Sequence, residues 1–278
     1  MSSDLLDLRL DLRDRREPYA VATVIEVFGS ASASAGSKAI IDRQGSLLAG
    51  WVGGGCAEGM VRQAAMDCLK NGIPTIIDID LNDEIFGAGM PCGGRMRVFL
   101  EPVMPAPQLW LMGHGLIAES LCALGAMLGY AVIVIDNLAT PDRFPRARRV
   151  IEDDVLYRQA VPTADDFAVI ATHHKGDYVA IRQLLRTETQ FIALVASHKR
   201  AQLVLRRLQA EGIGESALAR VRAPCGLAIG ARTPEEVALA IIAETVMFRR
   251  GGQGICKWEI NVGTSAVTED TAASVPGS

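Results

Sequence analysis

Two of the six cysteines in this chain of 278 residues lie in glycine-rich segments, where a thiol can approach a ligand. Cys56 follows three consecutive glycines and comes just before a stretch of helical periodicity. It therefore lies near the positive end of a helix, where the pKa of a thiol falls. Cys92 lies in a second glycine-rich segment, 87–94. A cysteine beside glycine-rich backbone in both segments favours the binding of a soft metal centre or of the sulfur of a ligand. Two ordinary tight turns are the equal alternative. The candidate cofactor-binding residues here are Gly53, Gly54, Gly55, Cys56, Glu58, Cys92 and Gly93, with Cys56 and Cys92 as candidate metal ligands.

A glycine turn between two buried strands is the second candidate site. Within residues 109–137, one apolar run ends at Gly113, helical periodicity begins after Gly115, and a second apolar run ends at Asp136. Ala118 completes a G-x-G-x-x-A pattern. Amide groups at the helix start can hold a phosphate, and Asp136 can accept hydrogen bonds from ribose hydroxyls. The order predicts a dinucleotide-binding unit that prefers NAD to NADP; a structural βαβ unit that binds nothing is the alternative.

Two neighbouring histidines, His173 and His174, follow a buried strand whose end should face the same crevice as the glycine turn. Consecutive residues of an extended chain point to opposite sides, so both imidazoles cannot easily bind one metal ion. Pocket lining is the favoured interpretation, and a metal site is the alternative.

Four arginines follow Asp136 closely in the sequence. A solvated basic surface is the favoured interpretation of such a cluster. The alternative is that the guanidinium groups flank an anionic ligand. The four are Arg143, Arg146, Arg148 and Arg149.

The elements that position these residues fall into two groups. Residues 1–104 predict a smaller α+β domain, and 105–250 alternate strands with helices, which predicts a Rossmann-like, doubly wound parallel sheet. The fold class is thus α/β. Residues 104–107 are the expected linker, and 251–278 are expected to be a partly disordered tail. The expected strands are 19–28, 38–42, 46–51, 74–80, 95–101, 109–112, 131–135, 167–172 and 191–196, and the expected helices are 4–16, 57–70, 116–128, 178–186, 201–210 and 234–250.

Composition narrows the function classes. A formal net charge of −4 argues against a general nucleic-acid-binding protein, although local amide groups can still bind an anion. The sequence shows neither an apolar run of membrane-spanning length nor a signal peptide, so a cytoplasmic location is expected. The cysteines lack C-x-x-C spacing, which disfavours a common zinc site. A disulfide framework is not expected in such a chain, and Cys68 and Cys122 fit apolar helix faces as core residues.

Several ordered motifs resemble those of the XdhC/CoxI family. They are GGGCxEG at 53–59, PCGGR at 91–95, FLEP at 99–102 and, most closely, RxPxGLxIGARTPEE at 222–236. The resemblance covers about residues 19–250. Members of this family are accessory proteins for molybdenum hydroxylases such as xanthine dehydrogenase and carbon monoxide dehydrogenase. The resemblance therefore implies a maturation factor that binds molybdenum cofactor, assists its sulfuration and delivers it to the apo-hydroxylase.

The resemblance also assigns residues in the second half. It implies that Thr172, His173 and Asp177 contribute to the cofactor site, and that Ser197 and Lys199 contact a phosphate. For Ser197, an ordinary helix cap is the alternative. One family motif is altered: where members have Gly-Ser-x-Pro-Arg, residues 29–33 read GSASA, so a basic contact is lost.

Three functions stay open. The first is a chaperone without catalytic residues that binds molybdopterin or its nucleotide form in the Rossmann crevice, with an apo molybdenum hydroxylase and a cysteine desulfurase or sulfurtransferase as partners. The alternative is an NAD-dependent oxidoreductase, with NAD or another nucleotide bound at the glycine turn. The third is a sulfur-transfer protein with a persulfide on Cys56 or Cys92. The oligomeric state is left open, a homodimer being one option.

Overall fold

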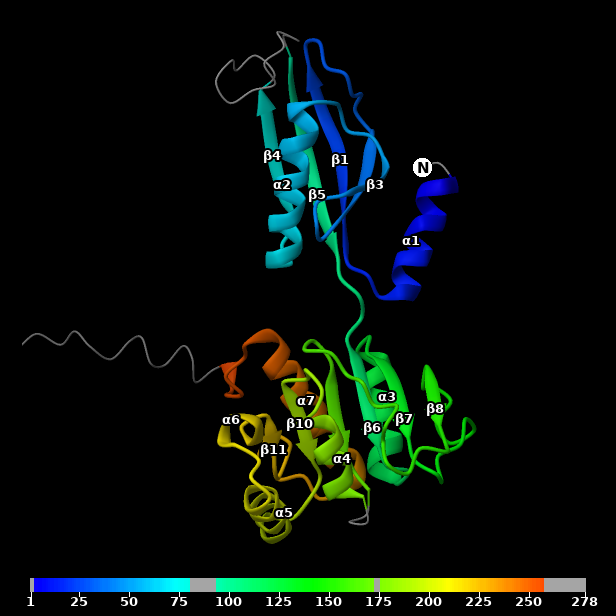
Figure 1. Ribbon diagram of the computed structural model, residues 1–278, viewed down its shortest axis with the longest axis vertical. Helices are drawn as coiled ribbons and strands as arrows, with labels where there is room; N and C mark the ends of the chain where they lie inside the picture. The colour runs from blue at the N-terminus through cyan, green and yellow to red at the C-terminus, as the bar shows by residue number, and fades with distance from the viewer. Residues whose placement is uncertain (1–2, 81–93, 173–175, 258–278) are drawn as a thin grey trace, which may run out of the picture. The chain divides into compact units, whose positions relative to one another are not determined.

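The computed structural model describes residues 3–80, 94–172 and 176–257, and the chain divides into two compact units, Met1–Ala106 and Pro107–Ser278 (Figure 1). Each unit has its own sheet and hydrophobic core. The segments around Cys56 and Cys92 belong to the first unit, and the glycine turn at 113–115 belongs to the second.

The first unit is a five-stranded antiparallel sheet with the order β3-β2-β1-β5-β4. Its strands are β1 (Tyr19–Phe28), β2 (Lys38–Asp42), β3 (Leu47–Gly50), β4 (Thr75–Asp80) and β5 (Arg95–Val103). Alternate residues of β1 serve opposite faces: Ala20 and Ala22 enter the core shared with α2 (Cys56–Asn71), whereas Tyr19 and Val21 pack with residues of α1 (Ser3–Arg15). The expected α+β arrangement is confirmed.

The second unit is a six-stranded parallel sheet with the order β8-β7-β6-β9-β10-β11. Its strands are β6 (Gln108–Met112), β7 (Ala131–Ile135), β8 (Arg149–Ile151), β9 (Phe167–Ile170), β10 (Phe191–Leu194) and β11 (Val221–Arg222). This is the 3-2-1-4-5-6 order of a Rossmann fold, and the winding reverses between β6 and β9. The expected doubly wound parallel sheet is confirmed.

Helices cover both faces of the parallel sheet (Figure 1). α3 (Leu116–Met127) and α7 (Pro234–Arg250) contribute to the core on one face, and α4 (Asp177–Leu184) and α5 (His198–Ala210) contribute to the core on the other. At the start of α7 the hydroxyl of Thr233 accepts the N–H of Glu236, and the Glu236 carboxylate accepts the N–H of Thr233. This capping box pairs amide groups that a helix start leaves open, and Thr233 is the N-cap of α7.

Three short elements are not predicted by the sequence: β8, β11 and α6 (Glu215–Leu218). β8 begins at Arg149, in a stretch where the sequence predicts neither helix nor strand, and β11 has two residues. Segments this short carry no usable periodicity. β8 and β11 are strands because they pair with β7 and β10 respectively.

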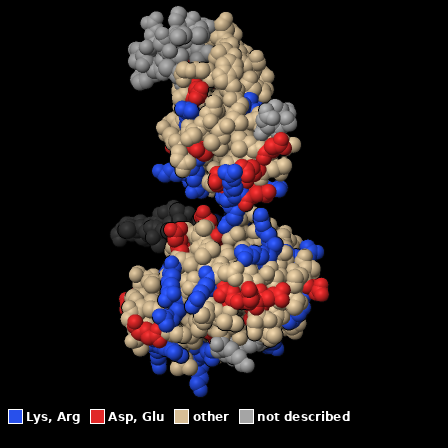
Figure 2. All heavy atoms as spheres, turned by 45° about the vertical axis from the view of Figure 1, so that its right-hand side comes forward, with Lys and Arg blue, Asp and Glu red and all other residues tan. Residues whose placement is uncertain are grey.

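Charges are mixed over the surface. Figure 2 shows basic and acidic side chains interspersed on the visible face of each unit. On that face, therefore, neither sign of charge forms one continuous field.

Candidate functional site

The glycine turn lies at the carboxyl edge of the parallel sheet, where the winding reverses. Gly113 has a φ of +140°, and a Cβ atom there would lie 2.2 Å from the carbonyl oxygen of Ala171, just beyond β9. Only glycine fits both this backbone conformation and this close approach. Gly115 precedes α3 in extended backbone, and no described side chain caps the helix start. The first amide groups of α3 are thus available for an anion.

Asp136 stands beside the turn, at the end of β7. Its Oδ1 atom lies 2.9 Å from Nδ1 of His114, the middle residue of the turn, and accepts the N–H of Leu138 at 2.9 Å. The Asp136 side chain is only 9% exposed. Among the described residues, its Oδ2 atom has no hydrogen-bond partner. One carboxylate oxygen is therefore held by the protein while the other remains available to a ligand.

One member of the arginine cluster reaches the turn. Arg143 donates a hydrogen bond of 2.6 Å to the carbonyl oxygen of His114 and pairs with the carboxylate of Glu119 on α3. Arg149 instead donates to Gln159 at 2.8 Å. Arg143 thus ties the segment after β7 to the start of α3. The two sequence-based interpretations of the cluster remain predictions.

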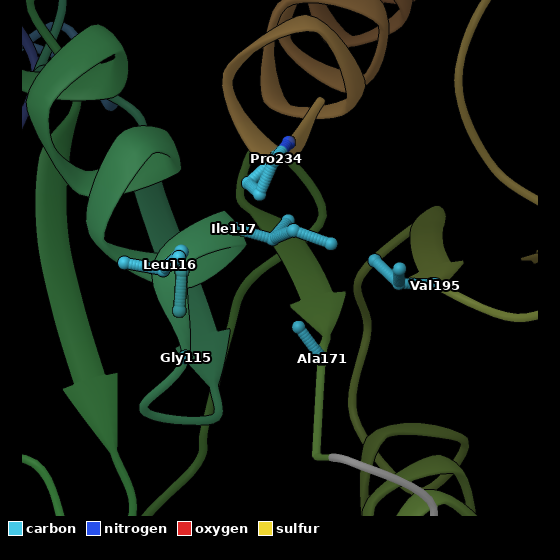
Figure 3. Close-up of a pocket in the computed structure, with 7 residues that line it drawn as sticks. Gly115, Leu116, Ile117, Ala171, Val195 and Pro234 are labelled. Carbon is cyan, nitrogen blue, oxygen red and sulfur yellow. The ribbon is translucent and has the colours of Figure 1, made fainter. Parts of the chain in front are cut away.

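An apolar hollow of about 300 Å³ lies on one side of the turn (Figure 3). In Figure 3 the Ile117 side chain lies among Pro234, Ala171 and Val195, which come from three further segments of the unit. Gly115 completes the wall nearest the turn. The starts of α3 and α7 therefore meet over an apolar space at the carboxyl edge of the sheet.

A polar hollow of about 460 Å³ lies on the other side of the turn. Its wall includes His114 and Asp136, the exposed apolar side chains Leu138 and Val155, and Tyr157. Asn137, Asp154, Thr172 and Gly176 complete it. The turn itself separates the two spaces, since His114 lines one and Gly115 lines the other.

Tyr157 is the residue of this site that sequence reasoning missed. It is 6% exposed, and it has a φ of +55°, a left-handed conformation that is uncommon for a non-glycine residue. Burial, with smaller contributions from Asp136, Asp177 and Asp154, raises the pKa of Tyr157 to about 12, so the hydroxyl stays protonated at neutral pH. Among the described residues, that hydroxyl has no hydrogen-bond partner. A single tyrosine in a segment without periodicity gave no signal in the sequence.

Thr172 and Asp177 form a buried network with Arg200. The Thr172 hydroxyl donates to Oδ1 of Asp177, and Nε of Arg200 donates to Oδ2 at 2.7 Å. Asp177 is 2% exposed, and each of its two carboxylate oxygens accepts a hydrogen bond from a side chain of the protein. Its evident role is to join the end of β9 to the starts of α4 and α5. Contact of Asp177 with a cofactor remains a prediction.

Ser197 is the N-cap of α5, where its hydroxyl accepts the N–H of Arg200 at 3.4 Å. The helix-cap interpretation is confirmed, and a phosphate contact stays a prediction. Ser197 and Lys199 are exposed and line a further hollow of about 370 Å³ with Arg206.

Three segments of the first unit meet at one end of its sheet. Gly55, with a φ of +60°, precedes Cys56 at the start of α2. A Cβ atom on Gly53 would lie 3.4 Å from Oγ of Ser32, and one on Gly94 would lie 2.3 Å from the carbonyl oxygen of Ser30. The altered loop at 29–33 therefore packs beside Gly53 and Gly94. For the remaining residues of this site, Gly54 has open space where a Cβ would be, and Glu58 pairs with Arg62 at 3.1 Å.

Several predicted residues lie outside the described part of the chain: Cys92, Gly93, His173 and His174. Within the described ranges, no group of three or more His, Cys, Asp or Glu is arranged to hold a metal ion. Metal binding by Cys56 and Cys92 therefore stays a prediction.

The other described cysteines are free, and most are shielded. Cys68 and Cys122 are buried core residues, as the sequence predicts. Burial raises the pKa of Cys122 to about 11, and burial together with Glu244 raises the pKa of Cys225 to about 12. Cys256 is exposed. Cys122 and Cys225 are poor nucleophiles at neutral pH, because the thiolate is the reactive form.

The segment around 222–226 acts as scaffold for the second unit. Glu244 of α7 is 8% exposed; it accepts the N–H of Gly226 at 2.6 Å and lies 3.3 Å from Nη1 of Arg222. The Arg222 guanidinium also lies over the rings of Phe191 and Phe248, 4.9 Å from each centroid. These contacts fix the loop that follows β11 against α7.

Comparison with protein families gives two matches. The model of the XdhC Rossmann domain matches residues 109–245, and that of the XdhC and CoxI family matches residues 12–80. The two matched stretches fall in the second and the first compact unit respectively. None of the described helices has the length and hydropathy needed to cross a membrane.

Three curated relatives resemble the chain. The uncharacterized protein YqeB of Escherichia coli is 28% identical over 251 residues, 87% of this chain and 46% of YqeB. A probable xanthine dehydrogenase subunit from Bacillus subtilis is 32% identical over 162 residues, 55% of this chain and 46% of that protein. The molybdenum cofactor insertion chaperone PaoD of Escherichia coli is 20% identical over 280 residues, 82% of this chain and 83% of PaoD. The matches thus span about half the length of the first two relatives and most of PaoD.

Proposed function

The chain belongs to the XdhC and CoxI family, and from this membership we propose that it is an accessory protein that binds molybdenum cofactor and inserts it into a molybdenum hydroxylase such as xanthine dehydrogenase. The observation that carries the proposal is the similarity to PaoD, which extends over most of both chains and includes both units. The similarity to the probable xanthine dehydrogenase subunit from Bacillus subtilis supports the choice of client class.

The second unit supplies a fitting place for a phosphorylated cargo. The uncapped start of α3 offers amide groups and the positive end of a helix to a phosphate. The apolar hollow beside it offers Ile117, Val195 and Pro234 to an uncharged ring. In this proposal, phosphate binding at the glycine turn orients the cargo, and the apolar walls exclude water from it.

The first unit supplies the thiols in this proposal. Cys56 and Cys92 bind the metal or its sulfur ligands while a cysteine desulfurase or sulfurtransferase carries out the sulfuration. Thiolate sulfur is the soft ligand that suits such a centre. Transfer of the cargo requires no bond to be broken by this chain, so no catalytic residue is assigned.

Mixing the purified chain with molybdenum cofactor tests the proposal. Molybdenum that co-elutes with the chain is measured by mass spectrometry, and the loaded chain is then added to a cofactor-free molybdenum hydroxylase. We expect retained molybdenum and a gain of hydroxylase activity. The chain with both Cys56→Ser and Cys92→Ser should lose most of this gain, whereas Cys256→Ser, an exposed cysteine, should keep it.

Two outcomes would contradict the proposal. One is a chain that neither retains molybdenum nor activates the hydroxylase. The other is reduction of NAD by the chain with a small-molecule substrate in the absence of any hydroxylase, which would favour an NAD-dependent oxidoreductase. Full activation by the double cysteine variant would remove the thiols from the proposal and leave the phosphate site.

A further inference from the structure

The polar hollow contains two buried polar groups that the protein leaves open. The hydroxyl of Tyr157 and the Oδ2 atom of Asp136 both belong to side chains that are more than nine-tenths buried. Among the described residues, neither atom has a hydrogen-bond partner, and both residues line the same space. Both atoms open onto the hollow and are not sealed in the core, so a ligand that enters it can pair with them.

The two groups define the chemistry of that ligand. A protonated tyrosine hydroxyl donates, and a carboxylate oxygen only accepts. A sugar hydroxyl can satisfy both, because it accepts and donates at once. A phosphate cannot, because it offers only acceptors to Asp136 and is repelled by the carboxylates of Asp136 and Asp154.

The rest of the wall suits a nucleoside. Leu138 and Val155 line the hollow with side chains that are 56% and 68% exposed, so apolar surface is open beside the polar pair. A flat base can cover such surface. The glycine turn adjoins the hollow through His114, so a phosphate at the start of α3 can be joined to a sugar in the hollow.

We propose that Tyr157 is a specificity-determining residue, and that the polar hollow binds the ribose of a nucleotide whose hydroxyls are both free, with Tyr157 donating to the sugar and Asp136 accepting from it. The inference rests on the proposed function for the identity of the nucleotide. It is either the nucleotide part of a conjugated molybdenum cofactor or a separate nucleotide bound beside the cargo.

Two local features indicate that the fold fixes the position of Tyr157. Its left-handed backbone is a conformation that a non-glycine residue keeps only when its surroundings fix it. Gly176 makes room for the hydroxyl, since a Cβ atom there would lie 2.5 Å from it. The placement of Tyr157 in the wall of the hollow thus depends on a left-handed backbone at Tyr157 and on a glycine at position 176.

Calorimetric titration of the full chain tests the inference. The probes are ADP, GDP and CDP and their 2′-deoxy counterparts, against wild type, Tyr157→Phe and Tyr130→Phe. The control is matched, because Tyr130 is also buried but its hydroxyl bonds Thr245 in the core. We expect wild type and Tyr130→Phe to prefer at least one ribonucleotide to its deoxy form by about tenfold, and Tyr157→Phe to bring that preference below about threefold.

Three results would overturn the inference. They are equal affinity of wild type for the ribo and deoxy forms, an equal loss of both in Tyr157→Phe, and no nucleotide binding by wild type at millimolar concentration. Molybdenum retention, measured separately, reports on the proposed function. A chain that retains molybdenum but shows any of the three results contradicts the inference alone, and a chain with the expected nucleotide pattern but no retained molybdenum contradicts the proposed function alone.

Competition identifies the source of the nucleotide. The best-binding nucleoside diphosphate is added to the molybdenum-loaded chain. Displacement of molybdenum supports a nucleotide that is part of the cargo. Binding of the nucleotide with molybdenum retained supports a separate nucleotide in the same hollow.

Discussion

Nδ1 of His114 lies 2.9 Å from Oδ1 of Asp136, so the middle residue of the glycine turn holds the acid that ends the neighbouring strand. The amide of Leu138 donates to the same oxygen at 2.9 Å. The carboxylate is therefore fixed before any ligand arrives, with its second oxygen toward the polar hollow. A group fixed in this way loses little freedom when a ligand binds.

Asp136→Asn should weaken the discrimination between NAD and NADP. The carboxylate repels a 2′-phosphate, and the amide carries no charge. We expect the ratio of the two dissociation constants to shrink by about tenfold, mainly through tighter binding of NADP. Titration of both nucleotides gives the ratio. Asp142→Asn, on an exposed aspartate of the same loop, should leave it unchanged, and an unchanged ratio in Asp136→Asn would exclude contact between this acid and the ribose.

Removing the hydroxyl of Tyr130 or of Tyr157 should affect stability differently. Tyr130→Phe loses a buried hydrogen bond of 3.0 Å to Thr245 and should lower the free energy of unfolding by about 1 kcal/mol. Tyr157→Phe loses no protein partner and should leave it unchanged or raise it slightly. Denaturant unfolding of the full chain, followed by a probe in the second unit, measures both. A larger loss in Tyr157→Phe than in Tyr130→Phe would mean that the Tyr157 hydroxyl is paired in solution.

Gly113→Ala and Gly129→Ala should separate the free-energy cost of a left-handed backbone from the cost of a steric clash. Gly129 has a φ of +82° with open space around it, so Gly129→Ala should cost about 1 kcal/mol through its backbone alone. Gly113→Ala adds a clash with the Ala171 carbonyl and should cost about 3 kcal/mol or more. Thermal unfolding of the two variants compares these costs. Equal melting temperatures would show that the turn can move away from β9.

The fold should lose stability in alkaline solution. The folded state raises the pKa of Cys225 from the ordinary 9.0 to about 12, so it holds this proton more tightly than the unfolded chain. The resulting stabilisation is complete below pH 9 and is lost as the pH rises toward 12. We expect the melting temperature of wild type to fall over this window, and that of Cys225→Ala to fall less. Cys256→Ala, at an exposed cysteine, is the control; a parallel fall in all three proteins would assign the loss to other groups.

The sequence predicts the parts of this molecule that depend on local pattern. The turn at Gly113 and the acid at Asp136 are both placed by residue type and spacing within one supersecondary unit. The helices and the longer strands follow from periodicity.

The remaining parts depend on partners distant in the sequence. Tyr157 is functional only because Gly176 leaves space for it and Asp136 lies nearby, and neither relationship appears in a linear pattern. Asp177 resembles a ligand in the sequence, yet in the fold both of its oxygens bond to Thr172 and Arg200. Burial decides these roles, and burial is a property of the assembled sheet and helices.

The contact between Gly113 and Ala171 also restricts how a bound molecule can leave. The N–H of Ala171 donates to the carbonyl oxygen of Met112 at 2.7 Å, and the N–H of Gly113 donates to that of Ile135 at 3.3 Å, so the bend cannot move outward without breaking these bonds. The loops after β7 and β8 carry the exposed side chains of Leu138 and Val155, which line the polar hollow, so a bound molecule would leave between them. Handing cargo to a client would then require the client to displace these two loops while the glycine bend stays in place.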